Sequence, residues 1–244
     1  MNNIRLTLQY DGTLYHGWQI QPNAKTVQET VKNAIKSIAG EEVNLIGCGR
    51  TDSGVHAINY TASFLTNSSV PADKFAPALN TKLPADIRIL KSEAMPLDFH
   101  AKNSAKGKTY IYRILNSSFP NAFERNYSWH YKIPLNVEKM QLASRAFLGE
   151  HDFSGFASSG MSVKTTVRTI YDISVEKSGD IITVSVSGNG FLYNMVRIIS
   201  GTLVFAGHDK INCYEMEDII TSCDRTRAGI TAPPQGLFLK EVYY

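Results

Sequence analysis

The amino-acid sequence predicts an α+β fold with largely antiparallel sheets. Segments with the two-residue alternation of strands and segments with the spacing of amphipathic helices follow one another in mixed order. Two strand-like segments, 167–176 and 181–188, are separated only by the four residues from Lys177 to Asp180, which predicts a β-hairpin. Few connections have the pattern of a parallel crossover, so antiparallel pairing is favoured.

The composition is that of a globular protein. The chain has 244 residues, enough for one large domain or for two smaller ones that share a core. Hydrophobic residues make up 43% and charged residues 19%, a balance that excludes a disordered chain. The net charge of +3 is compatible with a nucleic-acid partner but does not require one.

Local patterns define the first strand and the first helix. Residues 4–10 alternate apolar and polar side chains, which predicts a half-buried strand that ends at the Asp11–Gly12 turn. Thr26 followed by Glu29 forms a capping-box pattern, so we expect a helix from there to Gly40. The buried stripe of this helix is Val27, Val31, Ala34, Ile35 and Ile38.

The loop 14–22, between this strand and helix, carries two aromatic side chains, Tyr15 and Trp18, beside His16 and Gln19. Aromatic side chains in a loop can stack on nucleic-acid bases. They can equally pack over the edge of the core. The residues alone leave both interpretations open.

The later elements follow the same rules. Pro71 begins a short helix that ends near Lys82, and Asn136 can cap another helix. The apolar stripe of the Asn136 helix is Met140, Ala143, Phe147 and Leu148. A further helix buries Leu192, Met195, Val196, Ile199 and Leu203, and a last one spans about 216–223. The other strands are predicted over 43–46, 58–64, 87–90, 109–116 and 237–242.

A shift in composition over residues 101–108 marks the expected domain boundary, which divides the chain into 1–104 and 105–244. Lys102, Lys106 and Lys108 cluster there. They are either a phosphate-contact patch or a solvated connecting loop. The segment 155–166, rich in Ser and Gly, is expected to be a mobile loop.

Residues 47–57 form a predicted turn that carries several ionisable side chains. Three glycines, Arg50, Asp52 and His56 lie between two strand-like runs. Glycine permits a sharp turn that leaves the Asp52 carboxylate uncovered, and Arg50 lies two residues away, on the same side of an extended chain. An ionised carboxylate can act as a nucleophile or a base. By residue types alone, an ordinary turn residue that bonds its own backbone is the favoured interpretation of Asp52.

The stretch from Gly47 to Ala57 resembles the G-x-G-R-T-D-x-G-V-H-A signature of the TruA family of tRNA pseudouridine synthases, and it matches at every fixed position. Residues 188–197 resemble the family's G-N-x-F-L-x-x-M-V-R segment. Residues 228–237 resemble its closing A-G-x-T-A-P-P-x-G-L segment. The loop 14–22 is similar to the family's Y-x-G-(W/F)-Q loop, so the resemblance extends over nearly the whole chain.

The resemblance implies a pseudouridine synthase fold, with two ferredoxin-like halves that meet at a central cleft. It also implies site residues. Asp52 would be the catalytic nucleophile, supported by Arg197 and Arg50, and Tyr110 would line the substrate pocket. Further substrate contacts are expected from Arg50, His56, Lys106 and Lys108. Because Arg197 lies on a largely apolar helix, it needs a carboxylate partner, and we expect that partner to be Asp52.

The implied reaction converts uridine to pseudouridine in the anticodon stem-loop of tRNA, at positions 38, 39 and 40. The N-glycosidic bond breaks, the uracil turns over, and C5 bonds to the sugar. The carboxylate can attack the sugar, attack the base or remove a proton, and the sequence does not distinguish these routes. The target base would be flipped out of the RNA.

No metal or cofactor is expected. The three cysteines, Cys48, Cys213 and Cys223, form no C-x-x-C pair, and no step of the reaction needs a cofactor. The longest apolar run is too short to cross a bilayer, so we expect a cytoplasmic protein without membrane contact. The family implies tRNA as partner and a homodimer. The competing hypothesis is a catalytically silent RNA-binding module on the same fold, and a relative that modifies other uridines is a nearer alternative.

Overall fold

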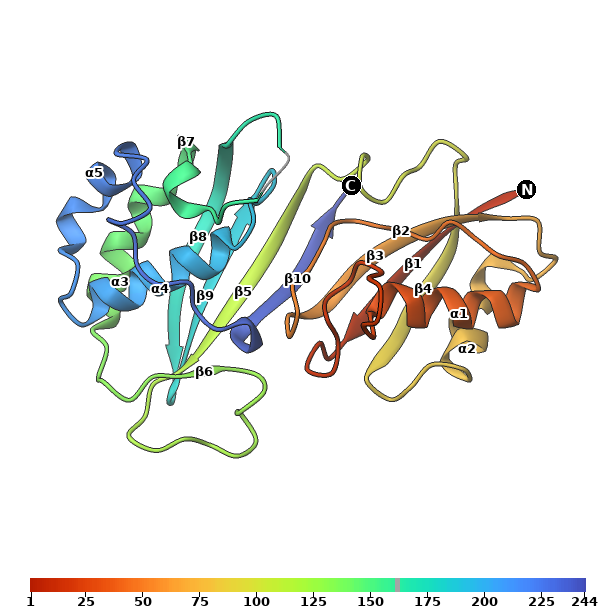
Figure 1. Ribbon diagram of the computed structural model, residues 1–244, viewed down its shortest axis with the longest axis horizontal. Helices are drawn as coiled ribbons and strands as arrows, with labels where there is room; N and C mark the ends of the chain where they lie inside the picture. Colours follow the sequence, from red (N-terminus) through yellow and green to blue (C-terminus); the bar gives the residue numbers. More distant parts are fainter. Residues whose placement is uncertain (161–162) are drawn as a thin grey trace. The chain divides into compact units, whose positions relative to one another are not determined.

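The computed structural model describes residues 1–160 and 163–244, and the chain divides into two compact units (Figure 1). Unit 1 comprises Met1–Lys106 and Phe238–Tyr244, and unit 2 comprises Gly107–Leu237. The expected mobile loop 155–166 includes Met161 and Ser162, and at these two positions the prediction lies outside the described residues.

The sheet of unit 1 is built around the antiparallel strands β4 (Ile87–Met95), β1 (Asn2–Tyr10) and β3 (His56–Thr66), in that order. Two shorter pairings share the other edge of β3. Strand β2 (Ile46–Gly47) is antiparallel to its second half, and β10 (Leu237–Tyr243) is parallel to its beginning. Most of β10, which the expected boundary assigns to the second half of the chain, therefore lies in unit 1, where Phe238 and Leu239 pair with β3.

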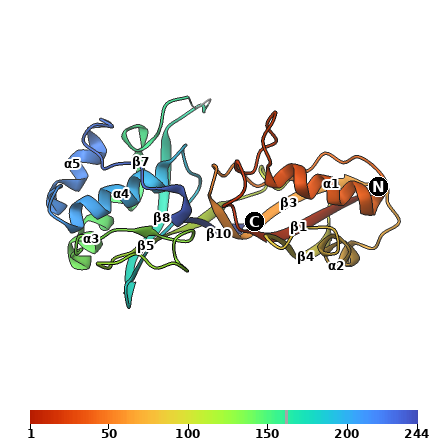
Figure 2. The same cartoon turned by 60° about the horizontal axis from the view of Figure 1, so that its bottom comes forward.

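Two helices pack with this sheet. Helix α1 (Val27–Ala39) runs alongside β1 and β3 in both views (Figures 1 and 2). Helix α2 (Phe75–Asn80) follows the 3₁₀ turn η1 (Ala72–Lys74) and packs on β4. The predicted alternation of β1 is confirmed, because Ile4, Leu6 and Leu8 are fully buried. The predicted stripe of α1 is confirmed for four of its members, which are Val27, Val31, Ala34 and Ile35.

The predicted capping box at the start of α1 is wrong. Thr26 is the residue before the helix, but its side chain makes no capping hydrogen bond. Instead, the first amides of the helix donate to carbonyls of the preceding loop: Val27 N to Gly17 O at 3.2 Å and Gln28 N to Trp18 O at 3.0 Å. Two first-turn amides, which have no partner within the helix, are thereby satisfied from outside it. Gly40 ends the helix in a left-handed conformation, as expected.

The predicted strand 43–46 is mostly irregular. Only Ile46 and Gly47 form strand pairs, although Val43 and Leu45 are buried. The Leu45 carbonyl accepts a hydrogen bond from the Gln28 side chain at 2.9 Å, so a side chain replaces a strand neighbour there. The strand predicted over 87–90 is longer than expected, because β4 pairs with β1 as far as Met95.

The sheet of unit 2 is antiparallel along its whole main path. The order is β5 (Gly107–Leu115), β9 (Ile181–Gly188), β8 (Val167–Ser178) and β7 (Gly149–Asp152). The short strand β6 (Trp129–His130) pairs in parallel with the end of β5. The predicted hairpin is confirmed, since β8 and β9 pair down to Ser178 and Ile181 and Gly179 has a positive φ of 58°.

Among its described residues, unit 2 also has the helices α3 (Val137–Ser144), α4 (Met195–Gly207) and α5 (Met216–Thr221). Helix α3 packs on α4 and on β8 (Figure 2). The 3₁₀ turns are η2 (Arg145–Phe147), η3 (Ser154–Phe156), η4 (Cys213–Glu215) and η5 (Pro234–Gly236). The predicted Asn136 cap is confirmed, because its side chain accepts from Lys139 N at 3.0 Å. Leu148 was wrongly placed in the core. It is 43% exposed, because the helix has ended and the backbone is extended there.

Candidate active site

The Asp52 loop, residues Gly47–Ala57, connects β2 to β3 in unit 1. Asp52 is half-buried, Arg50 is exposed, and Thr51 between them is buried. The predicted sharp turn is present. Val55 N donates to the Asp52 carbonyl at 3.2 Å, and Gly54 has a positive φ of 76°. The Asp52 carboxylate therefore lies on a tight turn, and the preceding residue, Thr51, is anchored in unit 1.

Thr51 is held from two sides. Its hydroxyl shares a buried hydrogen bond of 2.8 Å with the Tyr10 hydroxyl, at the end of β1. Its carbonyl accepts from Trp18 N at 3.1 Å. Both partners come from other elements, so the position of Thr51 is fixed by tertiary contacts. The backbone that bears Asp52 is fixed with it.

The loop 11–22, which follows β1, lies directly against the Asp52 loop. A Cβ atom on Gly12 would be 2.0 Å from the Val55 carbonyl oxygen, and one on Gly17 would be 2.3 Å from the Thr51 carbonyl oxygen. Gly17 also has a φ of +85°. Glycine is required at both positions because any side chain would separate the two backbones.

Buried aromatic rings of β1, β3 and the loop 11–22 pack together beside this contact. Trp18 and Tyr60 are stacked with centroids 4.1 Å apart, and Tyr10 lies 5.7 Å from Tyr60. The Tyr60 hydroxyl donates to the carbonyl of Gly49 in the Asp52 loop. Of the two interpretations left open for the loop aromatics, packing into the core is confirmed for Tyr15 and Trp18, since both are buried.

His56 is 2% exposed and lies at the beginning of β3. Its Nδ1 accepts a hydrogen bond from Gly12 N at 3.0 Å and is 3.1 Å from Asp11 Oδ1. The ring stacks on Phe238 with centroids 4.6 Å apart. This burial favours a structural role, in which His56 ties the turn after β1 to β3. A direct contact of His56 with substrate stays a prediction.

Tyr110 lies on β5 in unit 2, and its ring meets Phe191 edge to face at 5.1 Å. It is 9% exposed, so one small part of the side chain reaches the surface. Tyr110, Tyr112 and Ile114, which alternate along β5, are all buried.

Arg197, in the first turn of α4, is half-buried and joins the helix to the closing segment of the chain. Its Nε donates to the Ala232 carbonyl at 2.7 Å, and its Nη1 donates to Asn194 Oδ1 at 2.6 Å. Ala232 N donates back to the Arg197 carbonyl at 3.2 Å. The guanidinium therefore fixes the segment that resembles the family's A-P-P motif.

Tyr112 was not predicted as a site residue, yet it holds the same segment. Its hydroxyl donates to the Pro233 carbonyl at 2.7 Å. Burial raises the pKa of this hydroxyl above its usual value, against a smaller lowering by Arg197, so the group stays protonated and remains a donor. The sequence offered only the alternation that buries Tyr112. It held no information on the partner of the hydroxyl.

The predicted site residues are divided between the two units. Unit 1 contains Arg50, Asp52, His56 and Lys106, and unit 2 contains Lys108, Tyr110 and Arg197. Lys106 is exposed and Lys108 is half-buried. The expected ion pair of Arg197 with Asp52 would join residues of different units, and it stays a prediction.

Within residues 1–160 and 163–244, no group of three or more His, Cys, Asp or Glu side chains is placed to hold a metal ion. Across the same ranges, no helix has the length and apolar character needed to cross a membrane.

Comparison with known proteins gives concordant results. A family model described as tRNA pseudouridine synthase matches residues 7–103 and 143–244. The tRNA pseudouridine synthase A of Acetivibrio thermocellus is 54% identical over 244 residues, with 100% of both chains covered. That of Thermoanaerobacter sp. is 52% identical over 244 residues, again with 100% of both covered. That of Ruminiclostridium cellulolyticum is 54% identical over 245 residues, at the same full coverage.

Among solved structures, the archaeal box H/ACA sRNP Nop10-Cbf5 complex is similar at a TM-score of 0.37 and 13% identity, covering 91% of this chain and 59% of that chain. The predicted α+β class with largely antiparallel sheets is confirmed by the strand pairings of this chain, and the predicted resemblance is confirmed by the family model and the full-length relatives. With a family model that matches most of its length and full-length relatives more than half identical to it, the chain belongs to the tRNA pseudouridine synthase family.

Proposed function

We propose that this protein, an isomerase, converts uridine to pseudouridine in the anticodon stem-loop of tRNA, at positions 38, 39 and 40. The observation that carries the proposal is the intact Asp52 loop in a chain of this family. Its turn presents a half-buried carboxylate, and its backbone is anchored through Thr51. A fixed nucleophile lowers the cost of reaching the reactive geometry.

The reaction rearranges bonds within one nucleotide. The bond between N1 of uracil and C1′ of ribose breaks, a bond between C5 and C1′ forms, C5 loses a proton and N1 gains one. The Asp52 carboxylate serves as the nucleophile or as the proton acceptor, and it stabilises positive charge on the sugar. Because the reaction is an isomerisation without a net redox change, the proposal includes no cofactor and no metal.

The other residues of the proposed site assist Asp52. Tyr110, with its ring packed on Phe191, would stack on the detached uracil. Arg197 would pair with Asp52 and keep it ionised. Arg50, which is exposed beside Asp52, would contact a phosphate or fill the space that the flipped base leaves. Lys106 and Lys108 would contact the RNA backbone. We also propose that the enzyme acts as a homodimer in the cytoplasm.

The variant Asp52→Asn tests the proposal. It keeps the shape of the side chain and removes its charge. We expect it to melt near the wild-type temperature and to bind tRNA at least as well as wild type, since one negative charge near phosphates is gone. It should form no pseudouridine, as measured by mass spectrometry of tRNA after incubation. The matched control is Asp73→Asn, an exposed aspartate of unit 1, which should keep full activity.

Two outcomes would contradict the proposal. Appreciable isomerisation by Asp52→Asn would exclude Asp52 as the catalytic group. A wild-type protein that binds tRNA tightly but yields no pseudouridine in any anticodon-arm substrate would favour the silent RNA-binding module.

The variant Arg197→Met tests the ion pair. Loss of the guanidinium should abolish most activity and raise the pKa of Asp52, so the acidic limb of the residual pH–rate profile should move to higher pH. Arg197 also bonds Ala232 and Asn194, and loss of these contacts alone would lower the rate at every pH. An unchanged pH profile, whatever the rate, would therefore exclude the pair.

A further inference from the structure

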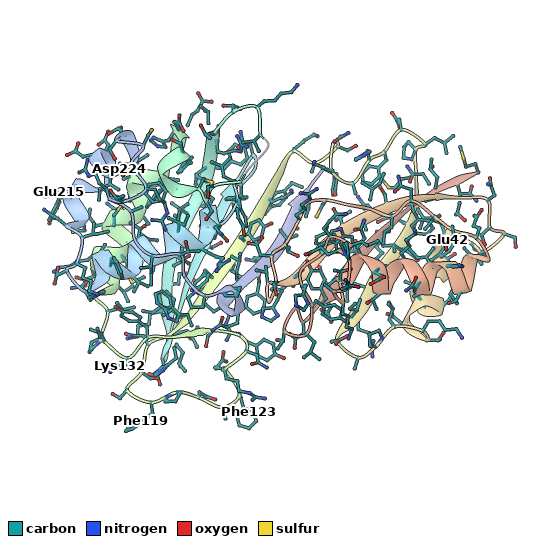
Figure 3. The ribbon with its side chains drawn as sticks, in the orientation of Figure 1. Glu42, Phe119, Phe123, Lys132, Glu215 and Asp224 are labelled. Atoms are coloured by element: carbon teal, nitrogen blue, oxygen red, sulfur yellow. The ribbon has the colours of Figure 1, made fainter. Side chains whose placement is uncertain are left out.

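The segment that joins β5 to β6 in unit 2 presents two large aromatic rings to solvent. We name residues 117–128 the aromatic loop. Phe119 is 82% exposed and Phe123 is 87% exposed, and both stand on the outer side of the loop (Figure 3). An isolated exposed apolar side chain is common on protein surfaces. Two nearly bare phenyl rings four residues apart in one loop indicate a binding surface.

The loop is ordered although its rings are exposed. Ser117 Oγ donates to the Phe119 carbonyl at 2.7 Å, and Phe123 N donates to Asn121 Oδ1 at 2.8 Å. Glu124 forms an ion pair with Arg113 of β5 at 3.1 Å. These contacts fix the backbone on both sides of the rings. A ligand that stacks on the rings would therefore meet a preorganised surface, with little entropy lost on binding.

The charge of the aromatic loop and of the residues just after it favours an anionic ligand. Glu124 is the only acidic residue in the sequence from 117 to 132, and Arg113 neutralises it. Arg125 and Lys132 are both exposed. An interface between two copies of this chain that is centred on the patch would place Arg125 and Lys132 of one copy close to the same cations of the other, which is unfavourable. A polyanion with flat, exposed bases complements both the rings and the cations.

We infer that the aromatic loop binds unpaired bases of the RNA substrate, with Phe119 and Phe123 as stacking surfaces and Arg125 and Lys132 as phosphate contacts. The inference rests on the proposed function, because it assumes that the substrate is tRNA. It adds a second contact to tRNA, on a loop that carries none of the residues proposed for chemistry. The loop would raise affinity for RNA that has unpaired bases and would leave the chemical step unchanged.

Affinity measurements with the full-length protein test this inference. The double variants Phe119→Ala/Phe123→Ala and Phe119→Leu/Phe123→Leu are compared with wild type by anisotropy titration of a labelled tRNA transcript. Leucine keeps most of the apolar area but lacks a flat face. Both double variants should bind tRNA at least about fivefold more weakly, and their affinity for a fully paired RNA duplex should be unchanged. Tyr214→Ala removes an aromatic side chain that is 80% exposed in the same unit, and it should bind as wild type.

The outcomes distinguish RNA from a second copy of this chain as the ligand of the aromatic loop. They also distinguish a failure of this inference from a failure of the proposed function. Melting temperatures near wild type and an unchanged sedimentation coefficient are expected, since the rings contribute little to the core. Wild-type tRNA affinity in both double variants would overturn the inference. A sedimentation coefficient lower than that of wild type, found for the alanine variant alone, would also overturn it. That result would show that the two rings bind a second copy of this chain. Pseudouridine formation by the wild-type protein is assayed in parallel, and its absence would contradict the proposed function irrespective of the variants' affinities.

Discussion

At the residue scale, the position of Asp52 depends on Thr51. The glycines of the sequence predicted the turn that carries Asp52, because turn propensity is local, and the family resemblance implied its catalytic role. The sequence could not predict what holds the turn. The Thr51 hydroxyl meets Tyr10, which lies 41 residues away along the chain, and the Thr51 carbonyl meets Trp18 N. Tyr10 was recognised only as the last apolar member of a strand. Its hydroxyl gained a partner only through the fold.

The hydrogen bond between Tyr10 and Thr51 is therefore expected to position Asp52. Tyr10→Phe leaves the Thr51 hydroxyl buried without this partner, at a cost of roughly 1–3 kcal/mol in stability. Because a small displacement of a catalytic group is costly, kcat should fall about 10- to 100-fold while KM for tRNA stays near wild type. Single-turnover rates at saturating enzyme measure this effect directly.

The matched control for Tyr10→Phe is Tyr15→Phe. It removes another buried hydroxyl of unit 1, one that donates to Asp86 Oδ1 at 2.7 Å outside the Asp52 loop. A comparable loss of stability with little loss of kcat is expected. If Tyr15→Phe and Tyr10→Phe lower kcat equally, the hydrogen bond to Thr51 has no special role.

At the element scale, two loops of unit 1 meet backbone to backbone. The alternation of β1 and the stripe of α1 were predictable because both patterns are local. The start of α1 was not, because its first amides bond the carbonyls of Gly17 and Trp18 instead of the Thr26 side chain. The loop 11–22 thus provides carbonyl acceptors for the first amides of α1, and its glycines Gly12 and Gly17 lie directly against the Asp52 loop. A capping pattern in the sequence carries no information on such a competing partner.

Gly17→Ala tests this contact between loops. The new Cβ would lie 2.3 Å from the Thr51 carbonyl oxygen and 3.1 Å from the carbonyl carbon of Asp52, so the Asp52 loop must shift. Gly40→Ala is the control, because Gly40 also has a positive φ, of 75°, but nothing lies within 4 Å of its Cβ position. Each variant is expected to lose roughly 1–3 kcal/mol of stability through backbone strain. Only Gly17→Ala should also lose most of its kcat, which thermal melts and kinetics would show. Equal kcat values in the two variants would exclude the coupling.

At the scale of the whole molecule, the parallel pairing of β10 with β3 could not be read from the sequence. The paired residues Phe238 and His56 are far apart along the chain. The sequence of an apolar strand does not indicate which strand it pairs with. The small net charge of +3 likewise shows nothing of where positive charge gathers. Lys102 and Lys106 are exposed at the end of the main segment of unit 1, whose last residue is Lys106, and Lys108 lies at the beginning of unit 2. The salt dependence of tRNA affinity is therefore expected to come from local clusters of lysines such as this one.

The double variant Lys106→Ala/Lys108→Ala tests that dependence. Each phosphate contact contributes about 0.7–0.9 to the slope of log affinity against log salt, so the double variant should have a slope smaller by about 1.5. The control is Lys74→Ala/Lys91→Ala, which removes the same charge from two exposed lysines that pair with Asp73 and Glu93. Its slope should match that of wild type. Titrations of tRNA at several salt concentrations give the three slopes. Equal slopes for all three proteins would remove Lys106 and Lys108 from the RNA interface, whereas a reduced slope in both variants would mean that net charge, and not this cluster, sets the attraction.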